Sequence, residues 1–488
     1  MMPTAIEHVS AELLQTQLYL GGHWRNASDG ATFEVYDPAT EAVLARVASA
    51  TAADGLAALD AAEAAFPGWA GRKPRERGEV LRKAFELIVA RKEELARLIT
   101  LENGKALVDA RAEILYAAEF FRWYAEEAVR NIGEIARGPS TGARIVIQHR
   151  PAGIAVLVTP WNFPAAMATR KIGPALAAGC PVIVKPASET PLTMLALMPL
   201  FEAAGVPKGV VSVLPSRRSG PLVDAMLHDP RTRVISFTGS TEVGRKLLHG
   251  AADCVVNPAM ELGGNAPFVV FDDADIEAAV SGAIVAKMRN MGEACTSANR
   301  FYVHEAVFDA FAARLAARMG GMRVGNGLDD GVEVGSLVNA ETRDKVVELV
   351  ADAVARGAKV LTGGRPIDGP GFFYQPTVLA DVPDEARCFR EEIFGPVAPL
   401  ARFTDEADVL RRCNDTEYGL VAYVFTRDVK RGLAFSERLD FGMVGLNRGL
   451  VSDPAAVFGG MKQSGIGREG AHEGLLEFLE TQYISVEW

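Results

Sequence analysis

The chain has 488 residues, which is enough for two or three domains with sizeable cores. Its hydrophobic content of 49% and its charged content of 23% are ordinary for a globular enzyme. The net charge of −11 disfavours a nucleic-acid-binding protein, which would carry a basic stripe, and an anionic membrane surface. We therefore expect neither nucleic acid nor a membrane as a partner.

The cysteines and the N-terminal residues bear on the cellular compartment. The five cysteines are few, odd in number and widely separated, so we predict neither a disulfide scaffold nor a metal site. Glu7, His8 and Glu12 occupy the segment where a signal peptide would need an apolar core. No run of about 18 apolar residues, the length of a membrane-spanning helix, occurs. These features predict a soluble cytoplasmic protein.

The first part of the chain predicts one strand followed by helices. The strand is expected over 18–24, before the turn residues 26–30. Thr51 lies three residues before Asp54, close to the spacing of a capping box, and so marks the start of a helix. The spacing of apolar residues predicts helices over 51–66, 75–91 and 106–131.

From residue 153 onward, short apolar runs alternate with helical patterns. Such alternation produces parallel sheets through right-handed crossovers, with ligands beyond the carboxyl ends of the strands. We therefore predict two α/β domains. A last strand over 481–488 has no obvious partner nearby, which suggests pairing with another subunit. Strands are expected at 153–158, 181–184, 210–214, 234–237, 268–271 and 300–303, and helices at 172–178, 192–204, 274–287, 307–319 and 339–355.

Three residues suggest covalent chemistry. Cys295 can supply a thiolate nucleophile, and Glu261, which precedes Leu-Gly-Gly, can move protons or activate water. Asn162, in the run Pro-Trp-Asn-Phe-Pro, offers an amide donor suited to an oxyanion. Taken singly, each has a plainer explanation: a buried inert thiol, a solvated strand or turn residue, and a turn packed by aromatic side chains. The interpretation depends on all three occurring in one chain.

Two strand ends could face a ligand. The strand at 234–237 leads into Gly239 and Ser240 and then a helix, which presents backbone N–H groups to an anion. The spacing is not the G-x-G-x-x-G fingerprint, and an ordinary strand–turn–helix junction would look the same. Lys185 ends another strand with an ammonium, although a solvated lysine beside Pro186 is an equal alternative.

Together these motifs resemble those of the aldehyde dehydrogenase superfamily, over nearly the whole chain. The resemblance implies that Cys295 attacks an aldehyde, that the Asn162 amide and the Cys295 N–H hold the oxyanion, and that Glu261 activates the water that hydrolyses a thioester. The hydride passes to NAD or NADP. The markers are the runs 160–164, 184–187, 237–241, 261–264, 292–295 and 391–396, and the implied cofactor-binding residues are Trp161, Lys185, Ser188, Gly239, Ser240, Glu392 and Phe394.

The same resemblance implies three structural units within an α/β fold. A Rossmann-like cofactor-binding domain is expected over 1–131 and 152–262, and an α/β catalytic domain over 263–470. Segments 132–151 and 471–488 would form a small β oligomerisation arm. A homodimer or homotetramer is then expected.

Within the superfamily, the strongest resemblance is to the succinate-semialdehyde dehydrogenases, in the runs 325–332, 414–420 and 442–447. Those enzymes hold the distal carboxylate of the substrate with two arginines and a serine, and the matching residues are Arg130, Arg289 and Ser452. A planar guanidinium suits this task because it meets a carboxylate through two hydrogen bonds.

Succinate semialdehyde is therefore the expected substrate, and another short ω-carboxy aldehyde, such as glutarate semialdehyde, is the alternative. A cofactor-independent cysteine hydrolase is the alternative from a different class. Such a hydrolase would have no need for the dinucleotide markers Lys185, Ser240 and Glu392.

Ser188 bears on the choice between NADP and NAD. Family members that strongly prefer NAD often carry a glutamate there, whose charge would repel a 2′-phosphate. Serine removes the repulsion, and Arg217 and Arg218 could add positive charge, so NADP is expected to be preferred. Glu189 would reverse the argument if its side chain turned inward. Ser297 stands where many members have a second cysteine, so a regulatory disulfide is not expected.

Overall fold

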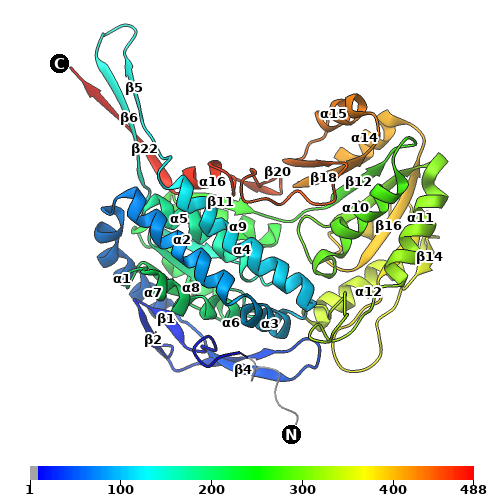
Figure 1. Ribbon diagram of the computed structural model, residues 1–488, viewed down its shortest axis with the longest axis horizontal. Helices are drawn as coiled ribbons and strands as arrows, with labels where there is room; N and C mark the ends of the chain where they lie inside the picture. Colours follow the sequence, from blue (N-terminus) through cyan, green and yellow to red (C-terminus); the bar gives the residue numbers. More distant parts are fainter. Residues whose placement is uncertain (1–8, 488) are drawn as a thin grey trace.

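The computed structural model describes residues 9–487. The expectations that concern Glu7, His8 and the end of the last strand at Trp488 lie outside these residues. Within the described range, no helix combines the length and the apolar character needed to cross a bilayer. The architecture is α/β, as predicted, with two sheet-centred bodies and a projecting β-arm (Figure 1).

The first body is built on an eight-stranded sheet whose centre is parallel and buried. At its centre the strands stand in the order β9-β8-β7-β10-β11, so the chain builds the sheet outward in one direction from β7 and then in the other from β10. Ligands bind at such a switch point in sheets of this kind. In sheet order the strands are β2 (His23–Arg25), β1 (Leu18–Leu20), β9 (Val211–Val213), β8 (Val182–Lys185), β7 (Ile154–Val158), β10 (Thr232–Thr238), β11 (Asn257–Glu261) and β21 (Gly465–Ile466).

The helices of this body agree largely with the sequence pattern. The Thr51–Asp54 capping box is present at the start of α1. The helix expected over 192–204 is two helices, because Pro199 favours a new first turn. The expected strand at 18–24 is a tight hairpin, since Gly21 and Gly22 both adopt positive φ. The helices are α1 (Ala52–Ala70), α2 (Pro74–Ala90), α3 (Lys92–Asn103), α4 (Leu107–Glu127), α5 (Ala166–Ala178), α6 (Pro191–Ala196), α7 (Met198–Ala204), α8 (Ser219–Leu227) and α9 (Thr241–Cys254).

The second body has a seven-stranded sheet, parallel except at its β14 edge. Residues 262–265 join the end of β11 directly to the start of β12, so the carboxyl ends of the first sheet meet the amino ends of the second. In sheet order the strands are β14 (Lys359–Thr362), β15 (Thr377–Ala380), β16 (Val397–Phe403), β13 (Ala298–His304), β12 (Ala266–Val270), β18 (Val421–Phe425) and β19 (Met443–Leu446), with helices α10 (Ile276–Met288), α11 (Glu305–Gly320), α12 (Ala340–Ala355), α13 (Arg387–Arg390), α14 (Glu406–Asn414) and α15 (Val429–Ser436).

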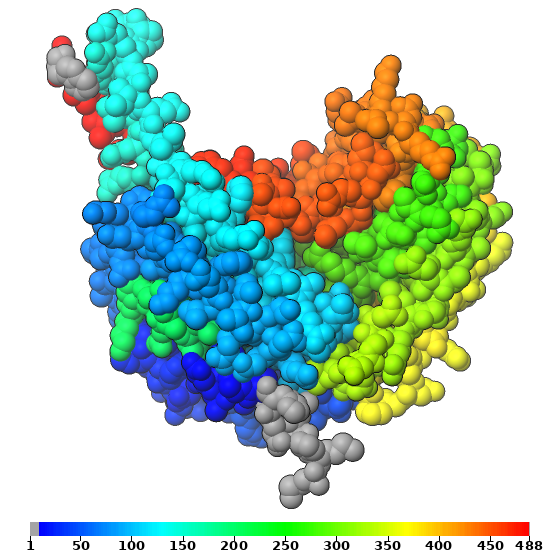
Figure 2. Space-filling model, viewed as in Figure 1, coloured from blue at the N-terminus to red at the C-terminus, as the bar shows by residue number. Residues whose placement is uncertain are grey.

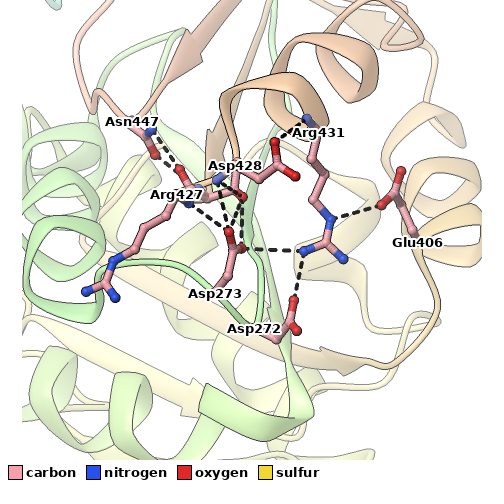
Figure 3. A network of polar contacts seen from close by, with 8 residues as sticks. Asp272, Asp273, Glu406, Arg427, Asp428, Arg431 and Asn447 are labelled. Atoms are coloured by element: carbon pink, nitrogen blue, oxygen red, sulfur yellow. Dashed lines mark hydrogen bonds and ion pairs between the residues drawn. The ribbon is translucent and has the colours of Figure 1, made fainter.

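The opposite end of this second sheet is filled by the chain's own polar groups (Figure 3). Asp273, just beyond β12, accepts hydrogen bonds from the Thr426 hydroxyl at 2.8 Å and the Asp428 N–H at 3.0 Å, and Arg431 lies 3.4 Å away. The Asn447 amide pairs with both backbone groups of Thr426, at 3.0 and 2.9 Å. The carboxyl ends of β12, β18 and β19 are therefore held together by polar groups of the chain itself.

A three-stranded arm extends from the first body (Figure 1). It consists of β5 (Glu134–Arg137), β6 (Arg144–Pro151) and β22 (Leu479–Val486), and β22 follows the short helix α16 (Glu473–Leu476). The last strand therefore has a partner within its own chain, β6. The local sequence pattern showed no such partner, whereas the family resemblance placed the two segments in one arm. In addition, β21 pairs with β11 of the first sheet, although it falls in the range assigned to the catalytic domain.

Two further antiparallel pairs complete the described strands. One joins β3 (Thr32–Tyr36) to β4 (Val43–Ala48), and the other joins β17 (Tyr418–Gly419) to β20 (Met461–Lys462).

Candidate active site

A cavity of about 350 Å³ lies where the two sheets meet. Its walls come from the ends of β7, β10 and β11, from the segments before β13 and β16, and from the start of α12. Seven residues predicted from the sequence line it: Trp161, Asn162, Gly239, Ser240, Cys295, Glu392 and Phe394. The structure thus gathers segments that are separated by more than two hundred residues.

Cys295 is held by the backbone on both sides. A Cβ atom at position 264 would collide with the Cys295 carbonyl, so glycine is required at Gly264. The next carbonyl, that of Thr296, accepts a hydrogen bond from the Tyr423 hydroxyl at 2.8 Å. The nucleophile therefore stands on a fixed segment, and its side chain opens into the cavity.

The thiol of Cys295 is protonated at neutral pH in this environment. Burial raises its pKa to about 12, while the charge of Arg170 opposes that shift. Attack on an electrophile therefore requires a group that accepts the thiol proton.

Asn162 is held in place by hydrogen bonds of its side-chain amide and its backbone carbonyl. Its Nδ2 donates to the Glu293 carbonyl at 3.0 Å, and its backbone carbonyl accepts from Lys105 Nζ at 2.7 Å. Lys105 forms a fully buried ion pair with Glu113, at 2.6 Å. One amide N–H is thus used for positioning, and the other is available to an oxyanion in the cavity.

Glu261, the last residue of β11, is buried beside the cavity without lining it. Burial raises the pKa of its carboxyl well above the usual range, and the charge of Glu469 adds to this shift. The pKa of Glu469 is lowered, against its burial, by Arg170 and Lys171, both of which pair with it. Of the two carboxyls, Glu261 therefore holds the proton.

The predicted carboxylate-binding residues do not all come together. Arg289 lies over the Phe163 ring at 4.9 Å, and none of the ion pairs within residues 9–487 includes it. Its charge acts on the Cys295 thiol. Ser452 lines a different, open cavity of about 520 Å³, together with Arg448 and Asp453.

Arg130 is not part of this site. The helix that precedes it, α4, ends at Glu127, so Arg130 lies in the turn toward the arm. Its guanidinium is 53% exposed and pairs with Glu127 at 2.6 Å and Glu126 at 3.7 Å. Instead, the second cation whose charge acts on Cys295 is Arg170 of α5, which sequence reasoning missed. The available signal was the pair Arg170-Lys171, which interrupts an otherwise uncharged helix eight residues after Asn162.

The remaining walls fit a nicotinamide dinucleotide. Phe394 adopts a left-handed φ of 56° and stands edge-to-face against Trp161, with ring centroids 5.3 Å apart. The Glu392 carboxylate accepts from the Gly264 N–H at 3.2 Å. Ser240 caps the N-terminus of α9. Aromatic walls, a carboxylate for ribose hydroxyls and a helix N-terminus for phosphate are the groups that such a cofactor needs.

The residues around the predicted site for the adenosine ribose of the cofactor carry charges of both signs. Lys185 is buried at the end of β8, and burial lowers the pKa of its ammonium to about 8. Ser188 lies in an adjacent cavity of about 480 Å³ that Glu189 and Arg217 also line. The Ser188 hydroxyl is 3.2 Å from a Glu189 carboxylate oxygen and 3.5 Å from Arg217. One carboxylate and one guanidinium therefore compete at this position.

Residues 24–484 match the model of the aldehyde dehydrogenase family. The chain belongs to the aldehyde dehydrogenase family. This aldehyde dehydrogenase is 52% identical to a succinate-semialdehyde dehydrogenase of Paenarthrobacter nicotinovorans, over 91% of this chain and 99% of the relative. It is 47% identical to a glutarate-semialdehyde dehydrogenase of Pseudomonas putida, over 98% of both chains. A crystal structure of an Escherichia coli NADP-dependent enzyme superimposes with a TM-score of 0.97 at 45% identity, covering 98% of this chain and 99% of that one.

Membership of this family establishes the reaction class predicted from the motifs. The aldehyde dehydrogenase oxidises an aldehyde with NAD or NADP as the hydride acceptor. The family and the α/β fold are thereby confirmed. The roles of the individual residues remain predictions, to which the geometry above adds Arg170, Lys171 and Glu469.

Proposed function

We propose that this aldehyde dehydrogenase converts succinate semialdehyde to succinate, with Cys295 as the nucleophile. The main support is the 52% identity to a succinate-semialdehyde dehydrogenase, together with two guanidiniums, Arg170 and Arg289, whose charges act on the Cys295 thiol. Arg170 is already paired with Glu469, whereas Arg289 rests on an aromatic ring and forms no ion pair within residues 9–487, which leaves its guanidinium able to bind a carboxylate. A short aldehyde with a distal carboxylate suits this arrangement.

Cys295 sulfur attacks the aldehyde carbon, and the thiol proton is released to solvent as the C–S bond forms. The Asn162 amide and the Cys295 N–H receive the developing oxyanion; one such donor contributes roughly 3 kcal/mol to the transition state. Trp161, Phe394 and Glu392 would hold a nicotinamide cofactor, which would supply the hydride acceptor. The product of this half-reaction is a thioester on Cys295.

Hydrolysis of the thioester requires a base for water, and Glu261 is the candidate. It must first lose the proton that burial and Glu469 favour. The positive charges of Arg170 and Lys171 oppose the rise in its pKa and favour release of that proton to solvent. The water then adds to the thioester carbon, the C–S bond breaks, and the acid leaves with Cys295 restored as the thiol.

An aldehyde panel tests this function. Formation of reduced cofactor at 340 nm is measured with succinate semialdehyde, glutarate semialdehyde and butyraldehyde. We expect the largest kcat/KM with the first. A higher value with glutarate semialdehyde would favour that substrate, which the P. putida relative supports. Turnover of esters without any aldehyde oxidation would instead indicate a cysteine hydrolase.

NADP is the proposed preferred cofactor. Arg217 beside Ser188 and the structural likeness to an NADP-dependent enzyme support it, while the nearby Glu189 carboxylate opposes it. Ser188→Glu should lower kcat/KM for NADP far more than for NAD, because a second carboxylate would repel the 2′-phosphate. Ser188→Gln is the matched control, since it has similar size without charge. A wild-type enzyme that clearly prefers NAD would contradict the proposal.

A homodimer or homotetramer in the cytoplasm is the proposed assembly. Figure 2 shows a hollow between the arm and the lobe that carries α14 and α15. Exposed apolar side chains lie on the arm and on the elements between, namely Ile135, Met461, Ile466, Leu476 and Tyr483. Strand β19 is also an open edge of the second sheet. A second copy that carries the same edges and apolar side chains would cover them.

A further inference from the structure

The turn that leads to Cys295 has an unusual backbone. Asn290, Met291 and Gly292 follow α10 with φ values of 52°, 56° and 78°, so three consecutive residues are left-handed. This conformation costs roughly 1–2 kcal/mol for each residue that has a Cβ atom. It persists only where the surroundings hold it in place, and such strain is concentrated at functional sites.

The Asn290 side chain links this turn to the oxyanion residue. Its Nδ2 donates to the backbone carbonyl of Asn162 at 2.9 Å and to that of Glu293 at 2.9 Å. The Glu293 carbonyl also accepts from the Asn162 side-chain amide, at 3.0 Å. The Asn290 backbone N–H in turn donates to Asp109 of α4 at 2.9 Å. All of these groups are buried, apart from the intermediate Asp109.

We infer that Asn290 is a positioning residue that sets the distance between the Asn162 amide and the Cys295 N–H. The inference rests on the proposed roles of Asn162 and Cys295. The two oxyanion donors come from segments more than 130 residues apart, and Asn290 joins those segments through one NH₂ group. Asparagine meets both requirements, because it tolerates the left-handed region and carries two donors on one nitrogen.

Asn290→Gly keeps the left-handed backbone and removes the bridge. We expect the single-turnover rate of hydride transfer to fall about 100-fold, since a small misplacement at a reacting centre has effects of that order. The KM for aldehyde and the affinity for cofactor should change little. Alkylation of Cys295 by iodoacetamide should also persist, because that reaction forms no oxyanion. Equal losses of alkylation, cofactor binding and hydride transfer would show a merely structural role and overturn the inference.

Asn447→Gly is the matched control. Asn447 is also left-handed, with a φ of 54°, and its amide also makes two bonds to backbone groups, but at the far end of the second sheet (Figure 3). We expect it to lower thermal stability while hydride transfer stays near the wild-type rate. Equal slowing by both variants would contradict a specific role for Asn290.

Asn290→Asp provides a second test if the glycine variant does not fold. Only the protonated carboxyl can donate, so the ratio of variant to wild-type rates should fall as pH rises. A ratio that does not depend on pH would count against the inference.

A double-mutant cycle separates this inference from the proposed function. In an Asn162→Ala background, Asn290→Gly should lower the rate of hydride transfer little further, because Asn290 acts through Asn162. If Asn162→Ala alone leaves the rate unchanged, the proposed oxyanion role fails. If Asn162→Ala slows hydride transfer, and Asn290→Gly slows it further by the same factor as in the wild-type enzyme, the positioning role fails.

Discussion

Cys295→Ala should lower kcat by about 10⁶-fold, to the limit of detection, as removal of a covalent nucleophile does. Without sulfur there is no covalent adduct from which hydride can leave. Cofactor affinity should stay nearly intact, because the thiol is one of many groups that line the cavity. Absorbance at 340 nm measures turnover, and fluorescence titration measures cofactor binding.

Cys413→Ala is the control for that experiment. Cys413 is also fully buried, and burial likewise raises the pKa of its thiol to about 12, but it lies away from the cavity. It should keep turnover near the wild-type value. Glu261→Gln should differ from both, retaining the first burst of reduced cofactor and losing steady-state turnover. Substantial turnover by Cys295→Ala would show that another group is the nucleophile.

Arg289→Ala should impair succinate semialdehyde much more than butyraldehyde, which has no carboxylate. A charge-assisted contact to a desolvated carboxylate is worth about 2–3 kcal/mol, or about 30- to 150-fold in kcat/KM. Arg289 is the cleaner test than Arg170, because removing Arg170 would also leave the buried Glu469 without one of its cations. Both aldehydes are compared by initial rates over a range of concentrations.

Arg130→Ala is the matched control, made at a residue that the sequence suggested as a contact to the substrate carboxylate. Its half-exposed ion pairs with Glu126 and Glu127 predict no change in selectivity between the two aldehydes. Equal losses on the two aldehydes for Arg289→Ala would refute a carboxylate contact there. A selective loss for Arg130→Ala would restore the assignment made from the sequence.

Elements marked by local sequence signals formed where those signals predicted them. The Thr51–Asp54 capping box and the apolar runs marked elements that form where expected, because caps and buried strands depend on nearby residues. Cys295 and Asn162 were found through short motifs, and they do share a cavity.

Relations that depend on distant residues were harder to predict. The local pattern gave no partner for the last strand, because β6 lies more than 300 residues earlier, and only the family resemblance grouped the two segments. Arg170 could not be told from a surface arginine until the helix around it was known to be buried. The direction of the Glu189 side chain depends on a rotamer, which sequence does not specify.

The direct connection through residues 262–265 has a consequence for how ligands enter and leave. It joins the two sheets at the point where Gly264 packs against the Cys295 carbonyl, and β21 returns from the second half of the chain to pair with β11 beside it. Swinging the two bodies apart would break both contacts and pull the nucleophile away from Glu261. We therefore expect exchange of cofactor and aldehyde to proceed by side-chain and loop movements at the cavity mouth, with the catalytic groups staying in register throughout turnover.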